Sequence, residues 1–175
     1  MHIILVAATS LDGKITKWGE AGVSGWNSRE DRQYFSELVA KEGVSIMGSG
    51  TYDVIKSTLK TVAGKLRIVM TSQPVRYRDQ QIAGSLEFWN DNPEKAVAKL
   101  KSLGYNEAFL FGGSEIYTSF LADKLVNELW VTMEPKIFGA GKNLAGTREL
   151  DIDLKLIEMT KLNERGTLLL KYEVL

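Results

Sequence analysis

The sequence predicts one α/β domain over residues 1–175, with three αβα layers and a mainly parallel central sheet that ends in an antiparallel C-terminal edge hairpin. Apolar runs alternate with helical patterns along the whole chain, which is typical of parallel strands joined by helices. The apolar runs are nearly continuous, which indicates strands that helices cover on both faces. No linker, repeat or low-complexity stretch interrupts the pattern, so a single domain is expected.

Short apolar or β-branched runs predict the strands of the parallel part of the sheet. They are residues 3–9, 44–48, 66–71, 107–111 and 129–133. Residues 153–162 and 167–174 alternate around an Asn-Glu-Arg-Gly turn, which predicts the edge hairpin.

Helical patterns with recognisable ends lie between the predicted strands. Ser28 is expected to cap a helix that ends near Lys41, and Asn92 to cap one that stops at Gly104. Pro93 occupies the first turn of the second of these helices, where its missing N–H does no harm. Two further helices are predicted over residues 51–59 and 114–121.

Composition narrows the class of function. The chain has 44% hydrophobic and 25% charged residues, no cysteine and the single histidine His2, so disulfides, thiolate chemistry and a metal site are not expected. Its 22 basic and 22 acidic residues cancel, which argues against nucleic-acid or membrane partners and favours a small molecule. The apolar run from Ile3 to Ala8 is too short to span a membrane and has no charged leader. We therefore expect a cytoplasmic protein.

Two glycine turns each close a predicted strand and open a predicted helix, one from Met47 to Tyr52 and one from Phe111 to Tyr117. Glycine lets the backbone approach a ligand closely, and a helix start offers unpaired N–H groups to phosphate. In an open sheet such turns fall beyond the carboxyl ends of the strands, where ligands bind. Two of them indicate a dinucleotide, although tight packing of a strand on a helix is the alternative for either turn.

Asp31 is the candidate acid. It shares one helix face with Phe35 and Leu38, so its carboxylate is expected to point inward and to have a raised pKa. Such a group could exchange a proton with a heterocycle. The spacing from Ser28 to Asp31 also fits a capping box, and this second interpretation stays open.

Several segments, in order and over nearly the whole chain, resemble dihydrofolate reductase and its relative, the reductase domain of the riboflavin-pathway bifunctional deaminase and reductase. The segment from Trp26 to Phe35 is similar to the folate branch, whereas the Ser-Leu-Asp-Gly-Lys wording of the first loop is similar to the riboflavin branch. The remaining segments that carry the resemblance are residues 47–52, 71–74, 112–117 and 135–142. The resemblance implies a dihydrofolate-reductase-like fold and NADPH as the cofactor.

The resemblance also implies a set of site residues. Asp31 would be catalytic, with Thr132 as its hydrogen-bond partner, and the substrate would contact Ala8, Trp26, Phe35 and Lys65. Residues implied to bind the cofactor are Ala8, Ile15, Gly48, Ser49, Gly50, Thr51, Thr71, Ser72, Arg76, Gly112, Gly113, Ser114, Glu115, Ile116 and Tyr117.

The chain departs from the family pattern at two basic positions. Ser49 stands where an arginine usually clamps the adenosine phosphates. Arg76 and Arg78 are the candidates to replace that arginine, with two solvated loop arginines as the alternative, and NADH stays open beside NADPH. Lys65 stands where folate reductases carry an arginine for the glutamyl carboxylate, and lysine offers only a point charge.

The sequence therefore predicts an NADPH-dependent reductase, with 7,8-dihydrofolate, reduced to tetrahydrofolate, as the first substrate. One alternative is the reductase step of riboflavin synthesis, on a ribosylaminopyrimidine phosphate. A second alternative is a protein that binds a dinucleotide without catalysis. The sequence leaves open whether the protein is a monomer or a homodimer.

Overall fold

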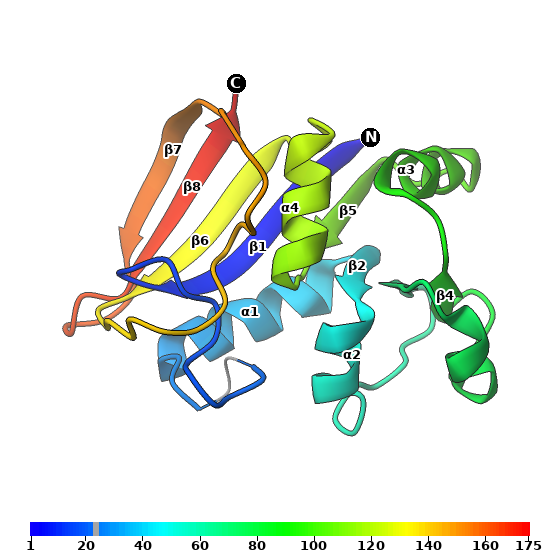
Figure 1. Cartoon of the computed structure of the whole chain (residues 1–175), viewed down its shortest axis with the longest axis horizontal. Coiled ribbons are helices and arrows are strands. Elements are labelled where there is room, and N and C mark those ends of the chain that lie inside the picture. The colour runs from blue at the N-terminus through cyan, green and yellow to red at the C-terminus, as the bar shows by residue number, and fades with distance from the viewer. Residues whose placement is uncertain (23–24) are drawn as a thin grey trace.

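The computed structural model describes residues 1–22 and 25–175 and shows an eight-stranded sheet with the order β4-β3-β2-β5-β1-β6-β8-β7 (Figure 1). Neighbouring strands from β4 to β6 are parallel, whereas β8 pairs antiparallel with both β6 and β7. The strands are β1 (His2–Ser10), β2 (Val44–Gly48), β3 (Leu66–Met70), β4 (Leu86–Trp89), β5 (Glu107–Leu110), β6 (Glu128–Glu134), β7 (Leu154–Lys161) and β8 (Leu168–Val174).

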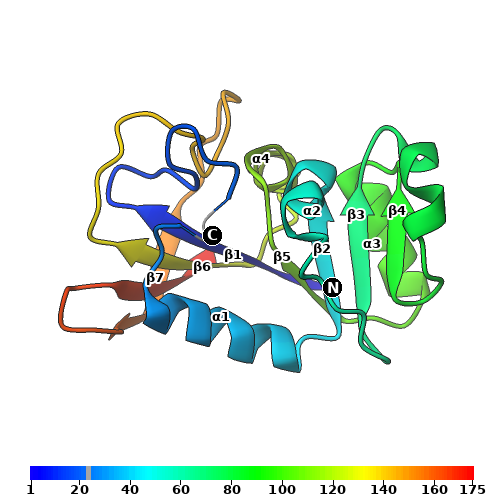
Figure 2. The same ribbon diagram turned by 90° about the horizontal axis from the view of Figure 1, so that it is seen from below.

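Helices cover both faces of this sheet. They are α1 (Arg29–Lys41), α2 (Ser49–Ile55), α3 (Pro93–Ser102) and α4 (Ser114–Ala122), with a 3₁₀ helix η1 (Pro74–Gln80) before β4. Figure 2 shows α1 and α4 on opposite sides of β1. The three-layer αβα class predicted from the sequence is confirmed.

Successive side chains of β1 point to opposite faces of the sheet, so this strand packs against the helices on both sides. Ile3 and Leu5 are buried together with Phe120 of α4 and Leu100 of α3. Ile4 and Val6, on the opposite face, are buried with Leu38 of α1 and with Phe109. A further cluster covers the sheet beside α1, where Tyr52 of α2 and Tyr77 of η1 pack on side chains of β2, β3 and β4.

The structure differs from the sequence predictions mainly around β4. The short segment Leu86–Trp89 and the 3₁₀ helix Pro74–Gln80 were not predicted, because a strand of four residues is too brief to show a clear period. Helix α2 begins at Ser49 rather than Thr51 and ends at Ile55 rather than Leu59. The other predicted strands and helices are present with ends shifted by a few residues, as is usual for such boundaries.

The register of β1 and β6 brings residues of the candidate site next to one another. β1 and β6 pair so that Ala8 lies opposite Thr132 and Ser10 opposite Glu134. Among the described residues, 1–22 and 25–175, there is no helix that is both long and apolar enough to cross a membrane.

Candidate active site

A cleft of about 1300 Å³ runs past the carboxyl ends of the parallel strands and along one side of α1. Both glycine turns line it, together with the end of β1 and the middle of β6. The lining includes these sequence-predicted site residues: Ala8, Ile15, Asp31, Phe35, Gly48, Ser49, Gly50, Thr51, Thr71, Ser72, Gly112, Gly113, Ser114, Glu115, Ile116, Tyr117 and Thr132.

Three predicted site residues, Trp26, Lys65 and Arg76, are not part of this lining. Trp26 is buried and packs edge-on against the ring of Phe138, with 5.1 Å between ring centroids. The ammonium of Lys65 donates a hydrogen bond to the backbone carbonyl of Val39 on α1. Trp26 thus packs on the segment that follows β6, and Lys65 binds the backbone of α1 at Val39, a residue that lines the cleft.

Asp31 reaches the cleft from the first turn of α1. Its side chain is buried, and its Oδ2 accepts a hydrogen bond of 2.7 Å from the amide Nδ2 of Asn27. Arg32 in turn donates to the backbone carbonyl of Asn27 at 2.6 Å, which holds this segment in place. Asn27 also lines the cleft, a placement that the sequence reasoning missed.

The helix cap is made without the Asp31 carboxylate. Ser28 is the N-cap, and its hydroxyl accepts a hydrogen bond of 3.2 Å from the backbone N–H of Asp31. In a capping box, the carboxylate would bond back to the N–H of Ser28. That N–H instead donates to Glu134 Oε1 at 2.6 Å, so the Asp31 side chain is left free to face the cleft.

Burial raises the pKa of Asp31 above its ordinary value. Hydrogen bonding from Asn27 and from Thr132 opposes the shift, while the charge of Glu134 adds to it and that of Arg32 opposes it. The result is a carboxyl group that keeps a proton more readily than a surface aspartate does. That property suits a group that donates a proton in a reaction.

Asp12, the other aspartate of the N-terminal segment, has a structural role. It accepts hydrogen bonds from the Ser10 hydroxyl at 2.6 Å and from the backbone N–H groups of Phe138 and Gly139. These bonds, led by that from Ser10, lower its pKa to about 2. Asp12 therefore stays ionised and ties the first loop to the segment after β6.

The two glycine turns touch each other. The N–H of Gly48 donates to the carbonyl of Gly112 at 2.7 Å, and a Cβ on Gly48 would stand 2.9 Å from Ile116 Cγ1. Gly112 has φ +102°, a conformation that favours glycine. At these two positions the turns allow no larger residue without movement.

Both helices that follow the turns begin without a side-chain cap. Gly48 and Gly113 are the N-caps of α2 and α4 and have no side chain to accept from the first N–H groups. Ser49 to Thr51 and Ser114 to Ile116 line the cleft at these helix starts. This arrangement of backbone donors and hydroxyls fits the diphosphate of a dinucleotide.

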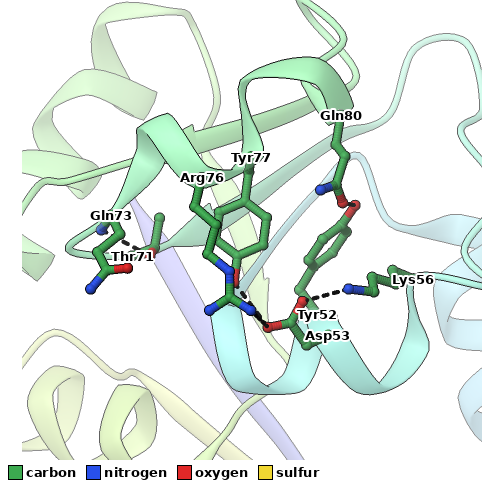
Figure 3. A network of polar contacts seen from close by, with 8 residues as sticks. All are labelled: Tyr52, Asp53, Lys56, Thr71, Gln73, Arg76, Tyr77 and Gln80. Carbon is green, nitrogen blue, oxygen red and sulfur yellow. Dashed lines mark hydrogen bonds and ion pairs between the residues drawn. The ribbon is translucent and has the colours of Figure 1, made fainter.

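A polar network surrounds the segment that follows β3 (Figure 3). Asp53 of α2 accepts hydrogen bonds from Tyr77 at 2.9 Å and Lys56 at 3.0 Å, and lies 3.9 Å from the guanidinium of Arg76. The Arg76 side chain is 65% exposed, so this ion pair is weak and the arginine can turn to another partner. Thr71 accepts a hydrogen bond from the N–H of Gln73.

At its other end the cleft passes Val39 and reaches a buried charged pair that the sequence reasoning missed. Glu42 and Arg67 are 3% and 4% exposed, and both line the cleft. Their sequence neighbours show no periodic pattern that would mark them, because one caps the end of α1 and the other lies within β3. No cluster suited to a metal ion occurs in the part of the chain that the structure describes.

The fold and the cleft together define a dihydrofolate-reductase-like reductase domain. Comparison with known families gives the assignment: the chain belongs to the family of the RibD C-terminal domain, whose model matches residues 1–168. This is a family of NAD(P)H-dependent reductases.

Individual relatives match the chain over most of its length. The chain is 30% identical to a Caenorhabditis elegans protein named "Putative dihydrofolate reductase", over 91% of this chain and 80% of that one. It is 26% identical to the Bacillus subtilis "Uncharacterized protein YwjB", over 94% of this chain and 89% of the relative.

Solved structures show the same fold. A crystal structure named as a putative riboflavin biosynthesis protein of Shewanella sp. PV-4 matches with a TM-score of 0.79 and 23% identity, over 100% of this chain and 99% of the other. The diaminohydroxyphosphoribosylaminopyrimidine deaminase/5-amino-6-(5-phosphoribosylamino)uracil reductase of Thermotoga maritima matches with a TM-score of 0.77 and 18% identity. That match covers 98% of this chain and 56% of the larger enzyme.

Proposed function

We propose that this protein is an NADPH-dependent reductase that reduces a dihydropterin, with 7,8-dihydrofolate as the first substrate to test. The observation that carries the proposal is the position of Asp31. Its carboxylate is buried in the wall of the cleft and takes no part in the helix cap that its spacing from Ser28 suggests.

The cofactor would lie across the two glycine turns. Backbone N–H groups at the starts of α2 and α4 would hold the diphosphate, with the hydroxyls of Thr51 and Ser114 beside them. The nicotinamide would lie toward Ala8 and Ile15, and the 2′-phosphate toward Thr71, Ser72 and Arg76. When bound, NADPH supplies the hydride.

Asp31 would bind the amidine edge of the pterin and promote protonation of the ring nitrogen next to the carbon that is reduced. Asn27 fixes the orientation of the carboxyl group through its 2.7 Å hydrogen bond. Thr132 lies beside Ala8 on the neighbouring strand and would position the same carboxyl group. Phe35, whose ring packs on Phe111 at 4.9 Å, would contact the substrate ring.

The first alternative is the reductase reaction on a ribosylaminopyrimidine phosphate. It is favoured by the names of the structural relatives, which include a 5-amino-6-(5-phosphoribosylamino)uracil reductase. In that case Asp31 would be less central, because no dihydropterin would need protonation.

Matched turnover assays on both substrates, each with NADPH and with NADH, test the proposal. We expect NADPH oxidation with dihydrofolate that is lost in Asp31→Asn. Turnover of the pyrimidine alone would favour the riboflavin-type reaction. Cofactor binding without oxidation on either substrate would instead support a dinucleotide-binding protein without catalysis.

A further inference from the structure

The cleft extends past the carboxyl ends of β3 and β4, and this part is where the adenosine of a bound cofactor would lie. The strand order is β4-β3-β2-β5-β1. A dinucleotide with its diphosphate at the glycine turns after β2 and β5, and its nicotinamide at β1, therefore extends its adenosine toward β3 and β4. Neighbouring strands lie about 4.8 Å apart, so β4 is roughly 10 Å from β2, within reach of the adenosine ribose.

The segments that follow β3 and β4 lie side by side at this end. The last residues of the two strands, Met70 and Trp89, are partners in the register. The N–H of Thr71 donates a hydrogen bond of 2.9 Å to the carbonyl of Trp89. Thr71 and Asp91, which follow these ends, both line the cleft. An acidic residue thus lies beside the segment that is expected to meet the ribose.

Asp91 is half-buried and takes no part in the cap of the following helix. The N-cap of α3 is Asn92, whose side chain accepts a hydrogen bond of 2.9 Å from the N–H of Lys95. None of the ion pairs within residues 1–22 and 25–175 involves Asp91. Its carboxylate is therefore available to a group that binds in the cleft.

The basic residues of the cleft lie elsewhere. In the part of the chain that the structure describes, those in the lining are Arg32, Arg67 and Lys142. The first belongs to α1, the second lies within β3 beside Glu42, and the third follows β6. None of them comes from the segments directly after β3 and β4, where Asp91 supplies a negative charge.

The two arginines that do follow β3, Arg76 and Arg78, are outside the lining. Figure 3 shows the guanidinium of Arg76 directed at Asp53 of α2, 3.9 Å away. A phosphate at the adenosine end would meet the carboxylate of Asp91 directly, whereas Arg76 would first have to leave Asp53.

NADH and NADPH differ only at the 2′ position of this ribose, which carries a hydroxyl in the first and a phosphate in the second. A carboxylate accepts hydrogen bonds from hydroxyl groups and repels a phosphate. In other sheets that bind dinucleotides, an acidic side chain that bonds the 2′-hydroxyl favours NADH in this way.

We propose that Asp91 is a specificity-determining residue for the cofactor: it accepts a hydrogen bond from the 2′-hydroxyl of NADH and opposes the 2′-phosphate of NADPH. It thereby limits the preference for NADPH. The inference rests on the proposed function only in placing a nicotinamide dinucleotide across the two glycine turns.

Asp91→Asn tests it, because asparagine keeps the size of the side chain and removes its charge. The dissociation constants of NADPH and NADH are measured calorimetrically, without substrate, on both proteins. We expect NADPH to bind about tenfold more tightly to the variant, the size of one like-charge contact. NADH should bind equally well or more weakly. An unchanged ratio of the two constants, or a ratio that moves toward NADH, would overturn the inference.

Two further variants show whether the effect belongs to this position. Asp151→Asn makes the same change of net charge at an exposed residue shortly before β7, at the other edge of the sheet, and should keep the ratio of the unaltered protein. Asp91→Glu retains the charge and should keep most of the discrimination. A shift in Asp151→Asn as large as that in Asp91→Asn would reduce the effect to net charge and refute the assignment.

The same measurements separate this inference from the proposed function. If the ratio shifts as expected but neither dihydrofolate nor the pyrimidine is reduced, the proposed reaction fails and the role of Asp91 stands. If both cofactors bind and dihydrofolate is reduced, but Asp91→Asn leaves the ratio unchanged, only the role of Asp91 fails. If neither cofactor binds to the unaltered protein, both fail.

Discussion

The backbone N–H of Ser28 donates a 2.6 Å hydrogen bond to Oε1 of Glu134, whose side chain is almost fully buried. Glu134 Oε2 also accepts from the hydroxyl of Thr167, at 2.8 Å. The end of β6 thereby completes the cap of α1 and joins it to the segment before β8. Because Glu134 accepts the hydrogen bond from the Ser28 N–H, the Asp31 carboxylate is not needed there and lines the cleft instead.

Replacing Asp31 by Asn tests whether its carboxylate acts in catalysis. The change keeps the shape of the side chain but removes the carboxyl group that can gain or lose a proton. Turnover should therefore fall by roughly two to four orders of magnitude, the usual size of an acid–base contribution. Affinity for NADPH should stay nearly constant. Steady-state kinetics and a cofactor titration on the same variant give both values.

The same variant should not lose stability. The raised pKa of Asp31 means that its ionised form is disfavoured in the folded protein, so removing the charge relieves a cost above that pKa. Ser28→Ala is the contrasting variant, since loss of an N-cap costs about 1 kcal/mol. A drop in melting temperature for Asp31→Asn with turnover intact would show that the Asp31 carboxylate stabilises the fold and does not act in catalysis.

The pH dependence of turnover should respond to the charged residues that shift the pKa of Asp31. Glu134 raises its pKa and Arg32 lowers it. If turnover needs protonated Asp31, activity declines as pH rises through that pKa. Glu134→Gln should therefore move the decline to lower pH, and Arg32→Gln to higher pH. Profiles of kcat/KM report the free enzyme, and shifts in the same direction for both variants would contradict the assignment.

Gly48 and Gly50 should respond differently to alanine. A Cβ at Gly48 meets Ile116 at 2.9 Å, whereas one at Gly50 meets nothing within 4 Å. Overpacking of this kind costs about 1–3 kcal/mol, so Gly48→Ala should lower the free energy of unfolding. Gly50→Ala, inside α2, should leave it unchanged or slightly higher. Urea unfolding of both variants provides the measurement.

Cofactor preference should depend on the arginines after β3. If Arg76 or Arg78 holds the 2′-phosphate, alanine at both positions should weaken NADPH binding more than NADH binding, and added salt should narrow the difference. Asp53→Asn, which removes the present partner of Arg76, should strengthen NADPH binding. Equal losses for the two cofactors would remove these arginines from the phosphate site.

Glu42 should give stability a particular pH dependence. Burial raises its pKa from 4.5 to about 6, against the charges of Arg67 and Lys65. The folded protein thus holds this proton more tightly than the unfolded chain. The contribution is fully present below pH 4.5 and is lost as pH rises through about 6. For this shift it amounts to about 2 kcal/mol.

Urea unfolding between these pH values measures that contribution. Glu42→Gln should have a shallower slope than the unaltered protein in the same window, and Glu37→Gln should keep the slope. A stability that rises with pH to the same extent in all three proteins would show that Glu42 does not keep its proton.

Local patterns in the sequence were sufficient to predict the fold class and several of the elements that line the cleft. The strands of the parallel sheet, the glycine turns and the helix that carries Asp31 were predicted, because apolar period, turn residues and capping residues act over a few neighbouring positions. The segment Leu86–Trp89 was missed since its pattern is too short.

The choice between the two interpretations of Asp31 could not be made from local pattern. It depends on Glu134, which is 106 positions away from Ser28 in the sequence and reaches it only through the pairing of β6 with β1. A hydrogen bond between distant segments leaves no periodic signal around either partner.

The sequence by itself determined the αβα fold, the two glycine turns and the inward face of α1, because each follows from interactions between near neighbours. Tertiary structure decided which groups meet on that frame. It left the Asp31 carboxylate out of the helix cap, bound Lys65 to the carbonyl of Val39, and brought Glu42 to Arg67. The physical reason is that burial and charge pairing depend on which distant segments pack together, and only strand register and helix packing fix that.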